Sequence, residues 1–451
     1  MNTKIFGDKK RLIAAGSAAL GFLLAAGLTL FFLLPPKATG EPPQFKLPSG
    51  GEDALKIAVL SDSLLGGENG VEGGAYYANT RAALSLCKQQ GVSAILYAGG
   101  MVANASAKNY AIFRALAQEV YGEATAPPML VAMSRAELKS AASHAIAQRA
   151  FTKALEQPLR AHASIGKVQL IAVSADATRS GTSAYSEKTI KWLEAALTAA
   201  AEAAKGSPIF VLAPDAEFDG MQALHPLLAK HPNVIAISGG SHLSQLDARM
   251  LTQSSFTSVG SQGLSFVVDY SDGDFNPTQA ATRAEDAPFA LIFAFSRNKL
   301  NIQRWNAAKQ RQESELSAWS LFLPLRTETF TYTQERRPQL APYFATQEIT
   351  AVDDIAVQGD TTKLDGVVFT AATDDERVAA YEIEAINRLN ISQTRRYATD
   401  SYLGSSAAAQ VCLALDPALP SGVYTVRVYA VDDFKNRSAA YLETRVEHKQ
   451  Q

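Results

Sequence analysis

Six short apolar runs alternate with helical stretches between residues 56 and 238, and this alternation limits the fold more than any other feature of the chain. The first run is Lys56–Leu60, and it leads into Ser61, Asp62 and Ser63. The other runs lie at residues 94–98, 128–132, 168–173, 208–212 and 233–238. Short apolar runs that end in glycine or small polar residues are typical of buried strands. Strands that alternate with helices predict a layered α/β domain.

The last part of this domain changes from helical to strand periodicity. Up to residue 248, stretches such as Tyr110–Tyr121 carry apolar residues at near-helical spacing. From Arg249 onward the apolar residues alternate with polar ones, which predicts antiparallel strands at residues 250–259, 264–270, 287–295 and 300–305. A short turn near Asn298 predicts that the last two form a hairpin. We therefore expect the main domain to cover residues 55–335.

Asp62 follows the first predicted strand directly. In open α/β sheets, ligands bind just beyond the carboxyl ends of the strands, where an acidic side chain can meet a metal ion or a substrate. Aspartate is also favoured as a cap of turns and helices. The segment by itself leaves both roles open for Asp62.

The N-terminus carries a long apolar run, Leu12–Leu34, between Lys9-Lys10-Arg11 and Pro35-Pro36. At about 1.5 Å per residue a helix of this length crosses roughly 30 Å of hydrocarbon. The basic flank is expected on the cytoplasmic side. We therefore predict a cytoplasmic tip and uncleaved transmembrane anchor at residues 1–36, a flexible linker at 37–54, and an extracytoplasmic body held at the cell membrane. A cleaved signal peptide is the alternative.

Composition disfavours two classes of function. The chain has 42 basic and 44 acidic residues and a net charge of −2, so it lacks the basic surplus typical of nucleic-acid binding. It has 2 cysteines, Cys87 and Cys412, which provide neither a disulfide framework nor a cysteine-based zinc site.

The order of these segments resembles the calcineurin-like metallophosphoesterase family. The family pattern is Asp-x-His, Gly-Asp, Gly-Asn-His-Asp/Glu, a later His and Gly-His-x-His, each at a strand end. The resemblance covers most of residues 55–335, and Tyr185–Leu193 is similar to the family's helix before the late His. It implies a β-sandwich flanked by helices and two metal ions that activate a water and clamp a phosphoryl group.

Most ligands of that pattern are absent from this chain. Asp62 matches the first Asp and His242 matches the last His. The remaining ligand or catalytic positions carry Leu64, Gly100, Ser134, Arg135, Ala136, Ala213 or Pro214, and Gly240. The resemblance therefore leaves Asp62 and His242 as remnant metal positions and assigns no catalytic residue.

This loss bears directly on the chemistry. A dinuclear site needs a bridging carboxylate and several imidazoles to hold two cations about 3.5–4 Å apart. Leucine, alanine and glycine side chains have no atom that can bind a metal ion, and Arg135 adds a positive charge where the cations should bind. Asp215, Glu217 and Asp219 would be replacement carboxylates or a solvated acidic loop, and Asp62 with loop oxygens would suit a single Ca²⁺. We expect no cofactor, or divalent metal ions if the site is active.

The C-terminal part, residues 341–447, shows short alternating strands with Asp and Gly turns. In Val423–Val431 the alternation puts Tyr424, Val426, Val428 and Ala430 on one face. About 100 residues of this pattern predict an antiparallel sandwich. The segment 422–438 resembles the late strand pair of a fibronectin type III-like domain, a module that binds or spaces other parts of surface proteins.

Three functions are open at this stage. The first is a membrane-anchored, catalytically degenerate metallophosphoesterase-like protein that binds or scaffolds at the cell surface. The second is an active metal-dependent phosphohydrolase with an atypical or single-metal site. The third is a surface-interaction protein whose C-terminal domain contacts a protein or another component of the cell envelope. The membrane itself is the partner expected for the N-terminal helix.

Overall fold

A computed structural model describes residues 43–122, 126–139, 143–176, 184–215, 221–267, 288–313, 319–336, 340–356, 363–375, 377–399 and 409–449. The predicted anchor at residues 1–36 lies outside these ranges, as does the linker up to residue 42. Across the ranges that are described, no helix has both the length and the apolar character that a membrane crossing requires.

The first three predicted strands lie side by side in one mixed sheet, with the order β13-β12-β11-β2-β3-β4 and with β14 paired to β12. The strands are β2 (Lys56–Leu60), β3 (Ala94–Ala98), β4 (Met129–Ala132), β11 (Phe289–Ser296), β12 (Lys299–Asn306), β13 (Arg311–Gln312) and β14 (Trp319–Phe322). Strands β2, β3 and β4 are parallel, so their carboxyl ends share one edge. The predicted hairpin of β11 and β12 pairs antiparallel with β2.

The later strands form a second sheet, with the order β1-β5-β6-β7-β8-β10-β9. Its strands are β1 (Gln44–Phe45), β5 (Arg160–Ile165), β6 (Val168–Val173), β7 (Ile209–Leu212), β8 (Val234–Ser238), β9 (Leu251–Gln253) and β10 (Thr257–Gly260). Strands β6, β7, β8 and β10 are parallel, and β5 and β9 run antiparallel to their neighbours β6 and β10.

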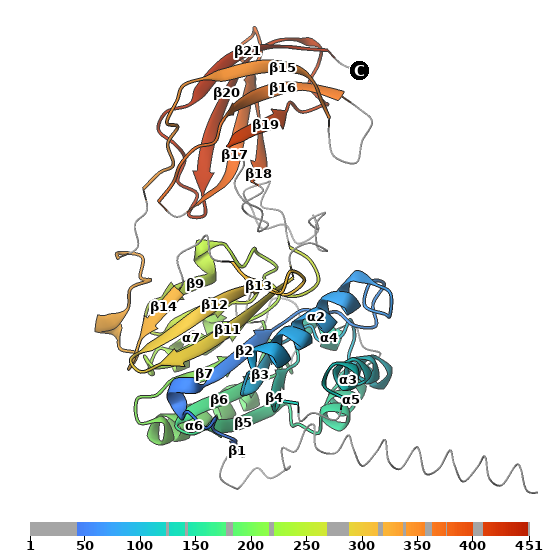
Figure 1. The fold of residues 1–451 in the computed structure, drawn as a ribbon, viewed down its shortest axis with the longest axis vertical. Helices are drawn as coiled ribbons and strands as arrows, with labels where there is room; N and C mark the ends of the chain where they lie inside the picture. The colour runs from blue at the N-terminus through green and yellow to red at the C-terminus, as the bar shows by residue number, and fades with distance from the viewer. Residues whose placement is uncertain are drawn as a thin grey trace, which may run out of the picture.

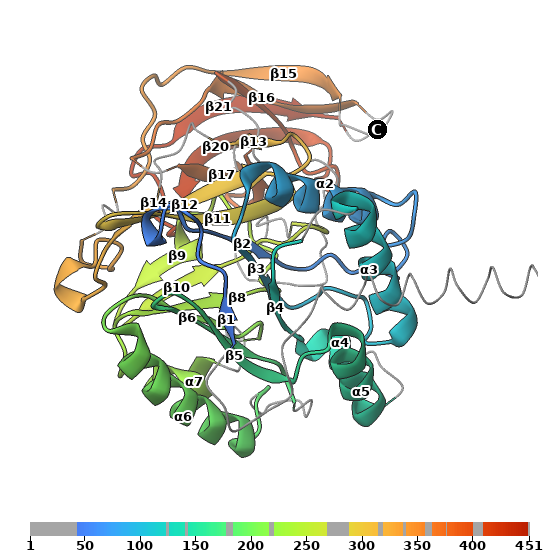
Figure 2. The same ribbon diagram turned by 60° about the horizontal axis from the view of Figure 1, so that its bottom comes forward.

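The two sheets face each other and carry helices on their outer sides (Figures 1 and 2). One buried cluster joins the inner faces of both sheets, including Val59, Leu96, Phe210 and Phe293. The helices are α2 (Ala75–Gln90), α3 (Ala107–Tyr121), α4 (Arg135–Lys139), α5 (His144–Leu155), α6 (Glu187–Ala204) and α7 (Met221–Leu228). Helices α2, α3 and α5 cover the first sheet, and α6 and α7 cover the second. The layered α/β domain predicted from the sequence is confirmed.

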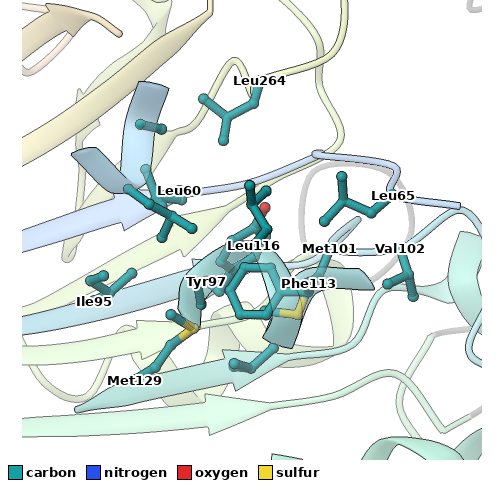
Figure 3. Packing of buried hydrophobic residues seen from close by; sticks show 14 of the residues in the cluster. Leu60, Leu65, Ile95, Tyr97, Met101, Val102, Phe113, Leu116, Met129 and Leu264 are labelled. Atoms are coloured by element: carbon teal, nitrogen blue, oxygen red, sulfur yellow. The ribbon is translucent and has the colours of Figure 1, made fainter. Parts of the chain in front are cut away.

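Helix α3 illustrates how the outer layer is fixed. Ser106 caps its N-terminus by accepting a hydrogen bond from the backbone N–H of Asn109. The buried face of the helix includes Phe113, whose ring meets that of Tyr97 on β3 edge-on, with centroids 5.9 Å apart. Figure 3 shows further apolar side chains gathered around this pair. Aromatic pairs of this geometry contribute about 0.5–1.5 kcal/mol beyond the burial of their area.

Two strand predictions were wrong. The stretch 250–259 contains two short strands, β9 and β10, because a turn brings the N–H of Ser254 to the carbonyl of Phe256. In the described part of 264–270, residues 264–267 form no strand. Gly263 adopts a φ of +99°, and the N–H of Leu264 donates to the carbonyl of Ser61, so this segment closes over the end of β2.

The C-terminal residues form two antiparallel sheets, β15-β16-β19 and β18-β17-β20-β21 (Figure 1). Their strands are β15 (Ile349–Ala356), β16 (Lys363–Thr370), β17 (Val378–Ile386), β18 (Ser392–Ala398), β19 (Gln410–Ala414), β20 (Gly422–Asp432) and β21 (Leu442–His448). On β20, the residues Tyr424, Val426, Val428 and Ala430 are buried, as the alternation predicts. The predicted antiparallel sandwich is confirmed in this respect.

Tyr424 fixes the chain before β20. Its hydroxyl donates a 2.8 Å hydrogen bond to the carbonyl of Pro420, four residues earlier. A tyrosine near the start of such a strand that bonds back to upstream backbone forms the tyrosine corner of β-sandwiches. We expect Tyr424→Phe to lower the free energy of unfolding by about 1–1.5 kcal/mol, because a partly buried carbonyl loses its donor. Urea denaturation checks this, and Tyr441→Phe, at an exposed ring, is the control with little expected change.

Asp433 joins the C-terminal sandwich to the main domain. Its Oδ2 accepts a 2.8 Å hydrogen bond from the backbone N–H of Ala248, and its Oδ1 pairs with Arg377 at 2.5 Å. Asp247, whose side chain is fully buried, lies beside this pair and is itself bound to Arg249 at 2.6 Å. Burial raises the pKa of Asp433, while the charge of Arg377 acts in the opposite direction. The two domains therefore meet through buried, paired charges.

Candidate functional site

The carboxyl ends of the parallel strands of both sheets meet at one edge of the main domain. The N–H of Asp62 donates to the carbonyl of Gly99, and the N–H of Leu64 donates to that of Gly100, so the chains after β2 and β3 stay paired. The loop after β8 reaches this edge from the second sheet, because the N–H of Gly240 donates to Asp62. This is where the sequence places the candidate site.

Asp62 lies at the centre of this edge. It is 5% exposed and has a φ of 51°, in the left-handed region. Its Oδ2 accepts the 2.9 Å hydrogen bond from the Gly240 N–H. Burial raises the pKa of Asp62, and the nearby charge of His242 and the hydrogen bonds from Gly240 and Ser61 oppose that rise. Asp62 thus ties the end of β2 to the loop after β8, a capping role across the two sheets.

Backbone occupies the space on two sides of the Asp62 side chain. A Cβ placed on Gly100 would lie 2.2 Å from Asp62 Oδ1 and 2.7 Å from Asp62 Cα. A Cβ placed on Gly263 would lie 2.7 Å from Asp62 Cβ. Both glycines have positive φ, +65° and +99°. Only glycine fits such close approaches without displacement, so the main chain itself closes the site around Asp62.

His242 lies near enough to Asp62 for its charge to lower the pKa of that carboxyl. Its ring stacks on Phe266, with centroids 3.9 Å apart and an interplanar angle of 19°. Its Nδ1 is buried and has no hydrogen-bond partner within the described residues. The structure therefore brings the two remnant positions together, but an aromatic ring covers the imidazole face.

The remaining strand ends pack directly on one another. A Cβ on Gly99 would lie 2.6 Å from the ring of Pro214, one of the two residues, with Ala213, that could correspond to the late His, and 3.0 Å from Ser134. A Cβ on Gly239 would lie 2.0 Å from the carbonyl oxygen of Ala98. Apolar and backbone atoms therefore fill the region between β3, β7 and β8 where the resemblance places metal ligands.

Asp215 is bound by groups at the ends of other elements. Its carboxylate accepts a 2.7 Å hydrogen bond from the backbone N–H of Arg135, and its own N–H donates to the hydroxyl of Tyr185 at 3.4 Å. Glu217 and Asp219, the other two acidic residues of that loop, lie outside the described residues. The carboxylate of Asp215 serves to connect the ends of β4 and β7.

Glu137 is a site residue that the sequence interpretation missed. It is 2% exposed, and its carboxylate accepts hydrogen bonds from the backbone N–H groups of Gly100 at 2.9 Å, Ser134 at 2.8 Å and Val102 at 3.3 Å. Ser134 and Glu137 have the spacing Ser-x-x-Glu of a capping box at the start of α4, and this signal was available. Glu137 therefore binds the loop after β3, including the glycine at the bridging-ligand position.

The buried carboxyl of Glu137 makes stability depend on pH. Burial raises its pKa from 4.5 to about 7, so the folded chain holds a proton that the unfolded chain releases between these values. The free energy of unfolding is then expected to fall by about 3 kcal/mol as pH rises from about 4.5 to 7.

Urea denaturation across that pH range checks this expectation. Glu137→Gln, which cannot titrate, is expected to reduce the slope of the pH profile, and the raised pKa values of Asp62 and Asp433 account for the slope that remains. Glu202→Gln, at an exposed glutamate of α6, is expected to retain the full slope. An unchanged profile in Glu137→Gln would show that other groups cause the dependence.

The residues at this edge do not fit a dinuclear metal centre. Asp62 and His242 match the family's ligands. The other ligand or catalytic positions carry Leu64, Gly100, Ser134, Arg135, Ala136, Ala213 or Pro214, and Gly240. Among the described residues, no group of three or more His, Cys, Asp or Glu side chains is placed to hold a metal ion. The carboxylates of Glu137 and Asp215 are engaged by backbone N–H groups instead.

Comparisons with known proteins give distant structural similarity. No protein-family model matches the chain, and no curated protein sequence matches it. Among solved structures, it is similar to purple acid phosphatase PPD1 from yellow lupin (Lupinus luteus) seeds, with 13% identity, a TM-score of 0.43, and coverage of 63% of this chain and 55% of that one. The aligned part is thus about half the length of the lupin enzyme. A cold-active protein-tyrosine phosphatase of a psychrophile Shewanella sp. gives 10% identity, a TM-score of 0.26, and coverage of 60% and 82%.

Proposed function

We propose that this protein is a membrane-anchored, extracytoplasmic metallophosphoesterase-like protein that lacks catalysis and acts by binding or scaffolding. The observation that carries the proposal is the closure of the strand ends around Asp62. The carboxylate of Asp62 accepts a hydrogen bond from the N–H of Gly240, and the backbone of Gly100 and Gly263 fills the space on two sides of the Asp62 side chain. A group used in this way holds two loops together and has no room to bridge two cations.

The proposed binding role belongs to the C-terminal domain, which we infer to be fibronectin type III-like. The arrangement of three and four antiparallel strands supports this, as does the corner formed by Tyr424 and Pro420. The buried junction at Asp433 would hold this domain in a fixed position on the main domain. Such an arrangement suits a protein that presents a binding module at a set orientation from the cell surface.

A hydrolysis assay tests the loss of catalysis. The full chain, purified in detergent, is incubated with bis(p-nitrophenyl) phosphate and added Mn²⁺, Zn²⁺ or Fe²⁺. We expect the rate to equal that of Asp62→Asn and of the metal-containing buffer. A metal-dependent rate that Asp62→Asn abolishes would contradict the proposal.

A single-ion phosphohydrolase is the second candidate. The observation in its favour is the buried Nδ1 of His242, which has no hydrogen-bond partner within the described residues and lies near Asp62. The same assay separates the two candidates, because this one requires activity that His242→Ala removes.

A further inference from the structure

The C-terminal sandwich contains a pocket of about 300 Å³. It lies between the edge strand β18 and the segment that follows β19. Its walls are formed by Ile383, Ala385, Gln393, Thr394, Arg395, Tyr397, Leu415, Asp416 and Leu419. This volume is at the lower end of the range that small-molecule and side-chain pockets occupy.

The floor of the pocket is part of the hydrophobic core. Ile383 and Ala385 come from the inner face of β17, and Leu415 and Leu419 follow β19. Each of these four residues is at most 3% exposed. An apolar group that enters the pocket would therefore rest on core side chains and lose its contact with water, which is favourable in proportion to the area buried.

The rim of the pocket carries a cation with few partners. The guanidinium of Arg395 lies 3.5 Å from Asp416 Oδ1 and 5.1 Å from the centre of the Tyr397 ring. Its side chain is 47% exposed. Asp416 Oδ1 already accepts a 2.9 Å hydrogen bond from the N–H of Ala418. A planar guanidinium that keeps free N–H donors is well suited to bind a carboxylate through two parallel hydrogen bonds.

The position of β18 at the edge of its sheet favours a peptide as the ligand that supplies the apolar group and the carboxylate. In the described sheet β18 is the outermost strand, paired with β17 on one side. Such an edge can pair with an extended peptide through main-chain hydrogen bonds, while pockets select its side chains. Gln393, Arg395 and Tyr397 alternate along this strand and all line the pocket. The hydroxyl of Tyr397 donates to the carbonyl of Ala414 and so fixes the wall across both sheets.

We infer that this pocket binds the free C-terminus of a peptide whose last residue is large and apolar. The last side chain lies on the floor formed by Ile383, Ala385, Leu415 and Leu419, and the terminal carboxylate pairs with Arg395. The inference rests on the proposed binding role of the C-terminal domain and names the chemistry of its partner.

Fluorescence polarisation with a labelled hexapeptide, Lys-Ser-Thr-Ser-Val-Phe, tests this assignment on the full chain in detergent. The peptide acid is expected to bind at least about tenfold more tightly than its C-terminal amide, since a charge-assisted pair is lost in the amide. Unlabelled N-acetylphenylalanine is expected to compete only weakly, because it lacks the main-chain partners of β18. If N-acetylphenylalanine competes as strongly as the unlabelled peptide, the assignment to a peptide is overturned and the ligand is a small apolar carboxylate.

Two variants and one control locate the binding. Arg395→Met is expected to weaken binding of the peptide acid at least about tenfold and to leave binding of the amide unchanged. Gln393→Trp, at an exposed rim position, is expected to block both. Arg445→Met, on an exposed part of β21, is the matched loss of a positive charge and is expected to have no effect. Equal binding of acid and amide, or an Arg395→Met variant that binds normally, would overturn the assignment.

The peptide-binding test and the hydrolysis test can fail independently of each other. If no peptide binds and the same preparation hydrolyses nothing, the ligand assignment fails and the loss of catalysis stands; Arg395 then only protects the sheet edge, as inward-pointing charges do. If the peptide binds and the preparation hydrolyses a phosphodiester in an Asp62-dependent way, the ligand assignment stands and the proposed loss of catalysis fails.

Discussion

Gly100→Asp is expected to lower the free energy of unfolding by about 3–5 kcal/mol, although it places a carboxylate where the family resemblance expects the bridging ligand. Gly100 has a φ of +65°, a conformation that costs about 1–2 kcal/mol for other residues. Its new Cβ would lie 2.2 Å from Asp62 Oδ1 and 2.7 Å from Asp62 Cα, and such overpacking costs about 1–3 kcal/mol. The second carboxylate would also repel the first.

Gly91→Asp is the matched control for this change. Gly91 ends α2 with a φ of +59°, and no atom lies within 4 Å of the Cβ that would be added. This variant therefore has the backbone strain without the contact, and we expect a loss of about 1–2 kcal/mol. Guanidinium denaturation of both variants compares them. Equal losses would show that the space beside Asp62 is open enough to take a ligand.

Asp433→Ala is expected to lower the free energy of unfolding by about 3–5 kcal/mol, because the buried guanidinium of Arg377 loses the carboxylate that pairs with it. The side chain of Arg377 is 5% exposed and pairs with Asp433 at 2.5 Å. The N–H of Ala248 in the main domain loses its acceptor in the same variant. The loss therefore affects the junction between the domains as well as the C-terminal sandwich.

Hydrogen exchange at the Ala248 amide distinguishes a loosened junction from general destabilisation. We expect exchange at Ala248 to become faster in Asp433→Ala than exchange at amides of β2, which lie deep in the main domain. Glu443→Ala breaks an exposed pair with Arg427 and is the control, with a small loss of stability and no change at Ala248. An Ala248 amide that exchanges no faster in Asp433→Ala would contradict the role given to the junction.

The local strands and helices of the main domain were predictable, but their distribution over two sheets was not. The buried runs at residues 94–98 and 234–238 are apolar on both faces, so they indicate burial without indicating which neighbour each strand pairs with. β5 was missed because Arg160 and His162 interrupt its apolar residues. The predicted strand over 264–270 was wrong in its described part because Gly263 turns the chain and Leu264 packs into the helix-side core.

The candidate site was predictable in its position and only partly in its contacts. The strand-end spacing identified Asp62 and His242, and the structure brings them together. The bond from Gly240 to Asp62 joins residues 178 positions apart, and no local pattern encodes such a contact. Glu137 carried a readable capping signal with Ser134, but its bonds to Gly100 and Val102 depend on how α4 meets β3. Contacts of this kind follow from tertiary packing.

Metal content of the purified full chain tests the closed strand-end site most directly. The protein is dialysed against Mn²⁺, Zn²⁺ and Fe²⁺ in turn, and bound metal is measured by inductively coupled plasma mass spectrometry beside Asp62→Asn. We predict less than stoichiometric metal, with no difference between the two proteins. One or two ions per chain that disappear in Asp62→Asn would show that Asp62 holds metal and would contradict this account.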